Sequence, residues 1–174
     1  MDALQYRVAG AAELDAAARV LGRSYRAAYR GLMDDAYLDG LAEDHWAPIL
    51  RDGYARGDTC VLALEAGALV GAAVFGAGEA PGEADFHAIY LLPGAVGRGV
   101  GHGLYAAVER EMRAQGFKWC TLEALSGNTG AVRFYAAHGF EPAGAFAVEE
   151  NGMRLACVKM RKYIGKAEGY GDET

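Results

Sequence analysis

The pattern of apolar and polar residues predicts a chain in which strands and helices are mixed. Alternating or short apolar runs predict strands at residues 4–9, 59–65, 68–76, 83–92, 117–124, 145–149 and 153–160. Apolar residues at helical spacing predict helices at 11–29, 34–41, 43–56, 100–115 and 128–139. The three strands between residues 59 and 92 should form an antiparallel meander. The strand–helix–strand unit that follows predicts a right-handed parallel crossover.

Turn and cap residues sharpen these boundaries. Ala66-Gly67 and Asn151-Gly152 are short connections between strands and predict β-hairpins. Asp34 and Asn128 stand where helix N-caps are needed, because their side chains can accept a hydrogen bond from the first turn. Pro48 fits best in the first turn of its helix, where a missing N–H has no cost.

Composition predicts one soluble domain. The chain has 174 residues, of which 52% are hydrophobic and 23% charged, so a single core-forming domain over 1–165 is expected. The Gly- and charge-rich segment 166–174 should form a flexible tail. No apolar run reaches the ~20 residues that span a bilayer, and the N-terminus lacks a signal-peptide pattern. A cytoplasmic protein that does not bind membranes is therefore expected.

Charge and metal-binding residue types restrict the function classes. The net charge of −6 argues against nucleic-acid binding and permits cationic amines as substrates. Three cysteines at 60, 120 and 157 lie in apolar runs and are expected to be reduced core residues. The histidines at 45, 102 and 138 show no metal-ligand spacing, so no metal site is predicted.

Residues 83–105 form the most informative stretch of the chain. A predicted strand stops at Pro93-Gly94, a loop with glycine at every second position from 97 to 103 follows, and an amphipathic helix begins. Such a loop can present free backbone N–H groups to an anion at a helix N-terminus. The spacing matches neither the Walker nor the Rossmann pattern. A compact connection without a ligand is the alternative interpretation.

Two motifs resemble those of the GNAT superfamily of acyl-CoA-dependent N-acyltransferases. The first runs from Leu92-Pro93 into Val96-Gly97-Arg98-Gly99-Val100-Gly101, which is similar to the Gln/Arg-x-x-Gly-x-Gly/Ala motif, with Val96 at the position of the usual Gln or Arg. A second register, Arg98 to Gly103, matches literally but lengthens the linker after the proline. The other motif, more specific, covers Asn128, Ala131, Phe134, Tyr135, Gly139 and Phe140.

The resemblance implies a fold and an activity. It implies an α/β fold with a mixed, mostly antiparallel sheet flanked by helices, in which the fourth and fifth strands splay apart to admit the pantetheine arm. It implies an N-acetyltransferase that uses acetyl-CoA and transfers the acetyl group to a primary amine of a small molecule or a peptide N-terminus by direct attack in a ternary complex.

The resemblance also implies roles for single residues. Tyr135 would protonate the departing thiolate, and Asn128 would hydrogen-bond the cofactor arm. Backbone groups near Leu91 and Leu92 would hold the pantetheine and polarise the thioester carbonyl. The pyrophosphate would be bound by the loop residues Val96, Gly97, Arg98, Gly99, Val100, Gly101, His102 and Gly103.

The general base has two candidates. Asp85 and His87 are two residues apart on one strand and so should project from the same face. Either could take the proton of the amine, directly or through water.

Two other interpretations stay open. The protein could be a non-catalytic acyl-CoA binder or regulatory subunit, or a partner-binding module that uses the aromatic helices between residues 23 and 56. A homodimer formed through an exposed last strand is also an option. The acceptor amine depends on residues 23–56, the loop 76–82 and the last hairpin, none of which carries a diagnostic motif.

Overall fold

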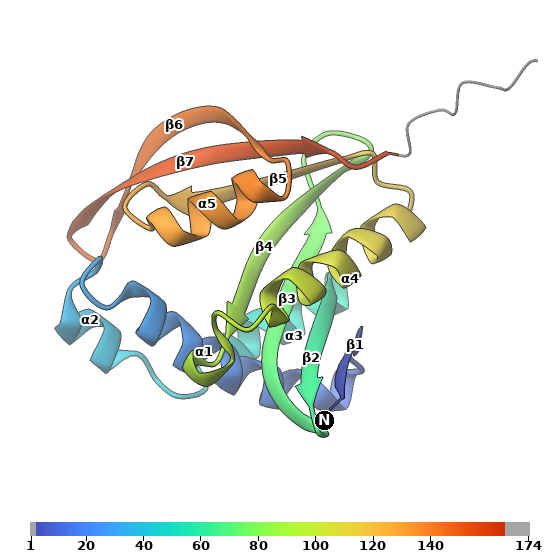
Figure 1. Ribbon diagram of the computed structural model, residues 1–174. Helices are drawn as coiled ribbons and strands as arrows, with labels where there is room; N and C mark the ends of the chain where they lie inside the picture. The colour runs from blue at the N-terminus through green and yellow to red at the C-terminus, as the bar shows by residue number, and fades with distance from the viewer. Residues whose placement is uncertain (1–2, 166–174) are drawn as a thin grey trace, which may run out of the picture.

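The computed structural model describes residues 3–165, which form one seven-stranded sheet with helices on both faces (Figure 1). The strands are β1 Leu4–Val8, β2 Thr59–Glu65, β3 Ala68–Ala77, β4 Glu83–Leu91, β5 Trp119–Leu125, β6 Glu141–Glu150 and β7 Met153–Tyr163. The α-helices are α1 Leu14–Tyr29, α2 Asp35–Gly40, α3 Trp46–Arg56, α4 Val100–Ala114 and α5 Thr129–Ala137. Two short 3₁₀ helices, η1 Ala11–Glu13 and η2 Pro93–Ala95, precede α1 and α4.

These elements match the predicted ones in type and order, with one clear difference in length. The strand predicted at 145–149 begins already at Glu141 and runs to Glu150 as β6. It includes Pro142 and Gly144, between which its register with β7 shifts. An edge strand tolerates proline, since one side of its backbone makes no ladder hydrogen bonds. The predicted tail, 166–174, lies outside the described residues.

The sheet order is β1-β2-β3-β4-β5-β7-β6, and only β4 and β5 are parallel. Their pairing covers just three positions, from Glu83 opposite Trp119 to Asp85 opposite Thr121. Beyond Asp85 the two strands separate, while β5 remains paired with β7 along its length. The predicted mixed α/β fold and the splay between the fourth and fifth strands are therefore confirmed.

Each face of the sheet has its own core. Helix α4 covers one face and buries Leu104, Tyr105, Val108 and Met112, the four residues whose spacing predicted its apolar side. Helices α1 and α3 cover the opposite face, where Leu21 is among the buried residues (Figure 1). Burying one leucine side chain stabilises the fold by about 1.5–3 kcal/mol. Apolar packing of this kind holds α4 to one face of the sheet and α1 and α3 to the other.

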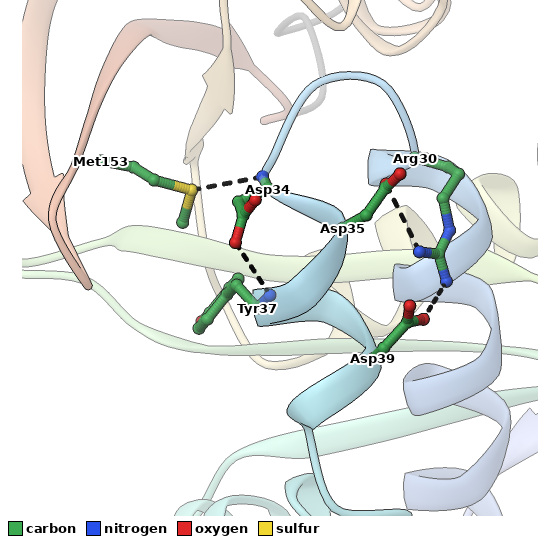
Figure 2. A network of polar contacts seen from close by, with 6 residues as sticks. All are labelled: Arg30, Asp34, Asp35, Tyr37, Asp39 and Met153. Atoms are coloured by element: carbon green, nitrogen blue, oxygen red, sulfur yellow. Dashed lines mark hydrogen bonds and ion pairs between the residues drawn. The ribbon is translucent and has the colours of Figure 1, made fainter.

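Short helix α2 is fixed by polar contacts at both ends (Figure 2). The Asp34 side chain accepts a hydrogen bond from the Tyr37 N–H at 3.1 Å, which confirms the predicted N-cap. Arg30 pairs with Asp39 at 2.6 Å. The Asp34 N–H also points at the Met153 sulfur, 3.4 Å away, and this contact joins α2 to the start of β7.

The three cysteines are free thiols within the core. Cys60, Cys120 and Cys157 are buried, as predicted, and burial raises the pKa of Cys60 and of Cys120 to about 12. Both thiols therefore keep their protons at neutral pH. Within residues 3–165, no helix combines the length and apolarity needed to cross a membrane.

Candidate functional site

A cavity of about 260 Å³ occupies the gap between β4 and β5. Its walls come from β4 between Phe86 and Leu91, from β5, from α5 with its N-cap, from the start of α4 and from the last turns of α1. The lining thus includes residues from both faces of the sheet. The separation of two strands has opened a passage through the sheet, which no packed pair of strands could offer.

A β-bulge shapes the β4 wall. Phe75 pairs with Phe86 and Val74 with Ala88, so His87 is an extra residue without a partner on β3. The bulge shifts the alternation of side chains, and Ala88 therefore faces α1 and α3 beside His87. Beyond residue 87, the side chains of the strand predicted at 83–92 therefore do not follow the alternation between the two sheet faces that its first residues set.

The two proposed bases are neighbours but differ in position. His87 Nδ1 lies 3.6 Å from Asp85 Oδ2, in agreement with the predicted shared face. His87 lines the cavity, whereas Asp85 is not among its lining residues. On the other side of the imidazole, His87 Nε2 lies 3.5 Å from Asp58 Oδ2. The imidazole is therefore the nearer of the two groups to any bound substrate.

The backbone of β4 turns N–H donors toward the cavity, and the Leu91 N–H is one of them. The Leu92 N–H donates to the Val70 carbonyl at 2.8 Å, so it is used by the sheet. Successive N–H groups of a strand point to opposite sides. The Leu91 N–H therefore points away from β3, toward the gap left by β5. Leu91 lines the cavity, and Leu92 does not.

Helix α5 and its N-cap bring Tyr135 and Asn128 to the same cavity. The Tyr135 ring packs against Phe86 and Phe140 with centroids 6.3 Å and 5.8 Å away. Burial raises the pKa of the Tyr135 phenol well above its usual value. Asn128 Oδ1 accepts the Ala131 N–H at 3.2 Å and so caps α5, while the amide N–H groups are the donors that this side chain can offer within the cavity.

The start of α4 faces the cavity mouth with backbone N–H groups. Gly97 and Gly99 have φ values of 78° and 82°, a conformation that favours glycine and turns the chain into the helix. The first N–H groups of a helix have no intrahelical acceptor, and they carry the positive end of the helix dipole. At Gly101 a Cβ would lie 3.4 Å from the Phe134 ring, so its backbone passes close to α5. A Cβ at Gly103 would instead meet Tyr6, away from the cavity.

The side chains of this loop supply little positive charge. Val96 is 62% exposed at the cavity edge. The Arg98 guanidinium pairs with the Glu65 carboxylate and donates to the Gly94 carbonyl at 3.2 Å. His102 Nδ1 lies 2.7 Å from His138 Nε2, so its ring is engaged with α5. Anion binding here depends chiefly on backbone N–H groups.

Several cavity residues carry only a weak signal in the sequence, or none. The Tyr29 hydroxyl lies 2.8 Å from that of Tyr90, and both residues line the cavity on the α1 side. Burial raises the pKa of both phenols, and hydrogen bonds from Tyr90 and Asn128 oppose this for Tyr29. Glu123 reaches the cavity from β5. Its only signal is a carboxylate within an otherwise largely apolar strand.

The aromatic residues of the helical region 23–56 divide between core and cavity. Tyr25 is buried and contacts the Met33 sulfur at 3.5 Å. Tyr37 donates to Glu150 at 2.9 Å and links α2 to β6. Tyr29 and Trp46 line cavities. Within residues 3–165, no cluster of three or more His, Cys, Asp or Glu side chains could hold a metal ion.

The architecture and the sequence together identify the family. Residues 23–140 match the family described as "Acetyltransferase (GNAT) family". The chain belongs to the GNAT acetyltransferase family. The match contains both motifs, the splayed strands and the cavity between them, and it confirms the family resemblance found in the sequence.

Solved structures with the same fold cover almost the whole chain. A PaiA N-acetyltransferase from Thermoplasma acidophilum in complex with coenzyme A is 17% identical, with a TM-score of 0.72 over 92% of this chain and 99% of its own. The yncA protein of Salmonella typhimurium, solved with acetyl-CoA, is 19% identical, with a TM-score of 0.71 over 99% of this chain and 100% of its own. The Escherichia coli ribosomal-protein-S18-alanine N-acetyltransferase is 17% identical, with a TM-score of 0.74 over 97% and 99%. No curated protein sequence matches this chain significantly.

Proposed function

We propose that this GNAT protein is an N-acetyltransferase that moves an acetyl group from acetyl-CoA to a primary amine by direct attack in a ternary complex. The observation that carries the proposal is the cavity between β4 and β5, which brings the Leu91 backbone, Tyr135 and His87 to one space. The solved PaiA and yncA structures contain coenzyme A and acetyl-CoA, which supports the choice of cosubstrate.

The residues at the cavity fit an acyl-CoA. The backbone N–H groups at the start of α4 would bind the pyrophosphate, because a helix N-terminus favours anions. The Leu91 N–H would donate to the thioester oxygen, where negative charge develops as the amine attacks. A bound acetyl-CoA would supply the activated acetyl group, and every other contribution comes from the chain itself.

Tyr135 is proposed to donate a hydrogen bond to the sulfur as the carbon–sulfur bond breaks. Burial raises the pKa of this phenol, so the hydroxyl keeps its proton throughout the neutral range. A free thiol has a pKa of about 8.5, well below the raised pKa of this phenol. Full proton transfer from Tyr135 to the departing thiolate is therefore unfavourable. Hydrogen bonding to the developing charge is therefore the contribution that Tyr135 can make most readily.

His87 is proposed as the group that takes the proton of the amine, directly or through water. It lines the cavity and lies between two carboxylates, with Asp85 Oδ2 3.6 Å from Nδ1 and Asp58 Oδ2 3.5 Å from Nε2. Asp85 lies behind His87 and would act through it. Glu123, on the opposite strand, is a further carboxylate within the cavity.

The experiment that tests the activity measures release of free thiol from acetyl-CoA in the presence of a panel of primary amines. Acetylation should be confirmed by mass spectrometry of the product. Thiol release that depends on both the amine and the protein supports the proposal. Coenzyme A binding without turnover of any amine would contradict it.

Such a negative result would favour a second function, a non-catalytic acyl-CoA binder. One observation favours this alternative: Val96 replaces the usual Gln or Arg, and Arg98 is neutralised by Glu65. Pyrophosphate binding by backbone N–H groups alone would be weaker, as suits a protein that binds acyl-CoA without turning it over. In that case the His87→Ala variant should bind coenzyme A with the same Kd as the natural chain, and neither protein should acetylate an amine.

A further inference from the structure

A second cavity adjoins the first on the α1 and α3 side of the sheet. It also measures about 260 Å³, and it shares His87, Ala88 and Tyr90 with the cavity between β4 and β5. Its remaining walls come from α1, α3 and β3. The two spaces meet at His87, the proposed base, so a molecule in the second cavity would have one end beside the acetyl-transfer site.

Asp58 lines this second cavity and is its most unusual residue. Its side chain is only 16% exposed. The basic side-chain nitrogens near it are His87 Nε2 at 3.5 Å and Arg56 Nη2 at 4.0 Å. Both distances exceed the ~2.7–2.9 Å of a charge-assisted hydrogen bond, and the Arg56 side chain is 70% exposed. A largely buried carboxylate with such weak partners can take a closer ion pair from a cation that enters the cavity.

The backbone around Asp58 leaves room for this carboxylate. A Cβ at Gly53 on α3 would lie 2.5 Å from one carboxylate oxygen of Asp58. A Cβ at Gly76 on β3 would likewise collide with the other oxygen. Larger residues at either position would displace the carboxylate from the cavity. Two glycines on different elements thus allow Asp58 to lie between α3 and the sheet.

We propose that this second cavity binds the acceptor, a primary monoamine with an apolar carbon skeleton, and that Asp58 holds its ammonium group beside His87. The walls away from Asp58 are formed by Leu21, Trp46, Ile49, Leu50 and Val74. These side chains suit a carbon skeleton, and the Arg56 guanidinium, which also lines the cavity, disfavours a second cationic group such as that of a polyamine. The proposal rests on the acetyltransferase function proposed above.

The same arrangement explains how the amine would react and leave. The ammonium gives one proton to His87, and its nitrogen bonds to the acetyl carbon as the carbon–sulfur bond breaks. The nitrogen loses a second proton, so that one proton ends on sulfur and one passes to solvent. The product is a neutral amide. Asp58 no longer attracts it, which favours release.

The test compares Asp58→Asn with Asp52→Asn, a matched loss of charge at an exposed position of α3. The probe amine is 2-phenylethylamine. In Asp58→Asn its KM should rise about 10- to 100-fold, while the Kd of coenzyme A stays unchanged and shows that the variant is folded. Asp52→Asn should behave as the natural chain does. An unchanged KM in Asp58→Asn overturns the proposal.

A second variant tests the apolar wall. Ile49 is 46% exposed, so Ile49→Trp can fill the cavity without disturbing the core. Its kcat/KM for 2-phenylethylamine should fall about tenfold or more, and that for ethylamine, whose short carbon chain fills less of the cavity, should fall less. Equal losses for both amines would contradict binding in this cavity.

Binding without turnover separates this proposal from the function on which it rests. Calorimetry should detect 2-phenylethylamine binding to the coenzyme A-saturated natural chain and a loss of that binding in Asp58→Asn. If this holds while no amine is acetylated, the enzyme function fails and the amine site stands. If amines are acetylated and neither variant alters binding, the amine site fails and the enzyme function stands.

Discussion

His102 Nδ1 lies 2.7 Å from His138 Nε2 and joins the first turn of α4 to the C-terminal end of α5. The His102 ring also stacks on Phe134, with centroids 5.1 Å apart. These contacts hold the proposed pyrophosphate site against the helix that carries Tyr135. Since one of the two nitrogens must accept the hydrogen bond, at least one ring must be neutral.

The stability of the protein should therefore fall in mild acid. Burial lowers the pKa of His138, and the positive charges of His102 and Lys162 lower it further. A histidine with a depressed pKa stabilises the fold above its unfolded pKa of about 6.5, and this contribution is lost as pH falls through that value toward the folded pKa. Melting temperatures between pH 8 and pH 5 should decline less steeply for His138→Gln than for the natural chain. The same slope in both proteins would contradict this, and His45→Gln at an exposed site is the control.

Replacing Tyr135 by phenylalanine should lower kcat about 100-fold, the low end for loss of a hydrogen-bond donor to charge that develops in the transition state. The ring packs among Phe86, Phe134 and Phe140, so the fold and the Kd of coenzyme A should be preserved. Steady-state kinetics with saturating acetyl-CoA measures the effect. The control is Tyr163→Phe, which is exposed on β7. Full activity in Tyr135→Phe would remove this residue from the mechanism.

Restoring a cation at position 96 should tighten acyl-CoA binding. Val96 is exposed at the cavity edge, and Arg98 is paired with Glu65, so a free guanidinium is missing near the loop. Val96→Arg should lower the Kd of coenzyme A up to about tenfold through charge-assisted hydrogen bonds. Titration at low and high salt is the measurement, and the gain should shrink at high salt. Val96→Met is the neutral control, and equal affinities for the Arg and Met variants would contradict the expectation.

Two substitutions separate the structural role of Asn128 from its proposed contact with the cofactor. Asn128→Ala removes the N-cap of α5 and should cost about 1 kcal/mol of unfolding free energy. Asn128→Asp keeps an acceptor oxygen for the Ala131 N–H and should unfold like the natural chain. Both lose the amide donors, so both should bind coenzyme A more weakly in a calorimetric titration. Natural affinity in Asn128→Asp would show that Asn128 only caps the helix.

Gly103 and Gly130 provide a matched pair of helical glycines. A Cβ at Gly103 would meet the Tyr6 ring, whose hydroxyl also hydrogen-bonds the Val100 carbonyl at 3.2 Å. Gly103→Ala should therefore destabilise the fold by about 1–3 kcal/mol through overpacking. A Cβ at Gly130 would meet no neighbouring atom within 4 Å, so Gly130→Ala should be neutral or stabilising by up to about 1 kcal/mol. Denaturant unfolding measures both, and equal stability of the two variants would contradict the contact.

The features that the sequence alone determined are local ones, set by residues close together along the chain. Helix α4 was predictable because Leu104, Val108 and Met112 recur at helical spacing, and all three are buried. Asn128 was predictable as a cap because its short side chain can reach a backbone N–H of the first turn. Both motifs are contiguous in sequence, so the family could be named from them.

Contacts between distant residues were decided by the tertiary structure alone. The bulge at His87 depends on pairing with β3, and the neutralisation of Arg98 depends on Glu65, 33 residues away. Asp58 and Glu123 reach the two cavities only because several elements meet where β4 and β5 part. Periodicity reports how each segment buries its own apolar face. It carries no information on which charged groups the packed segments bring together, because that depends on register and helix placement across the whole sheet.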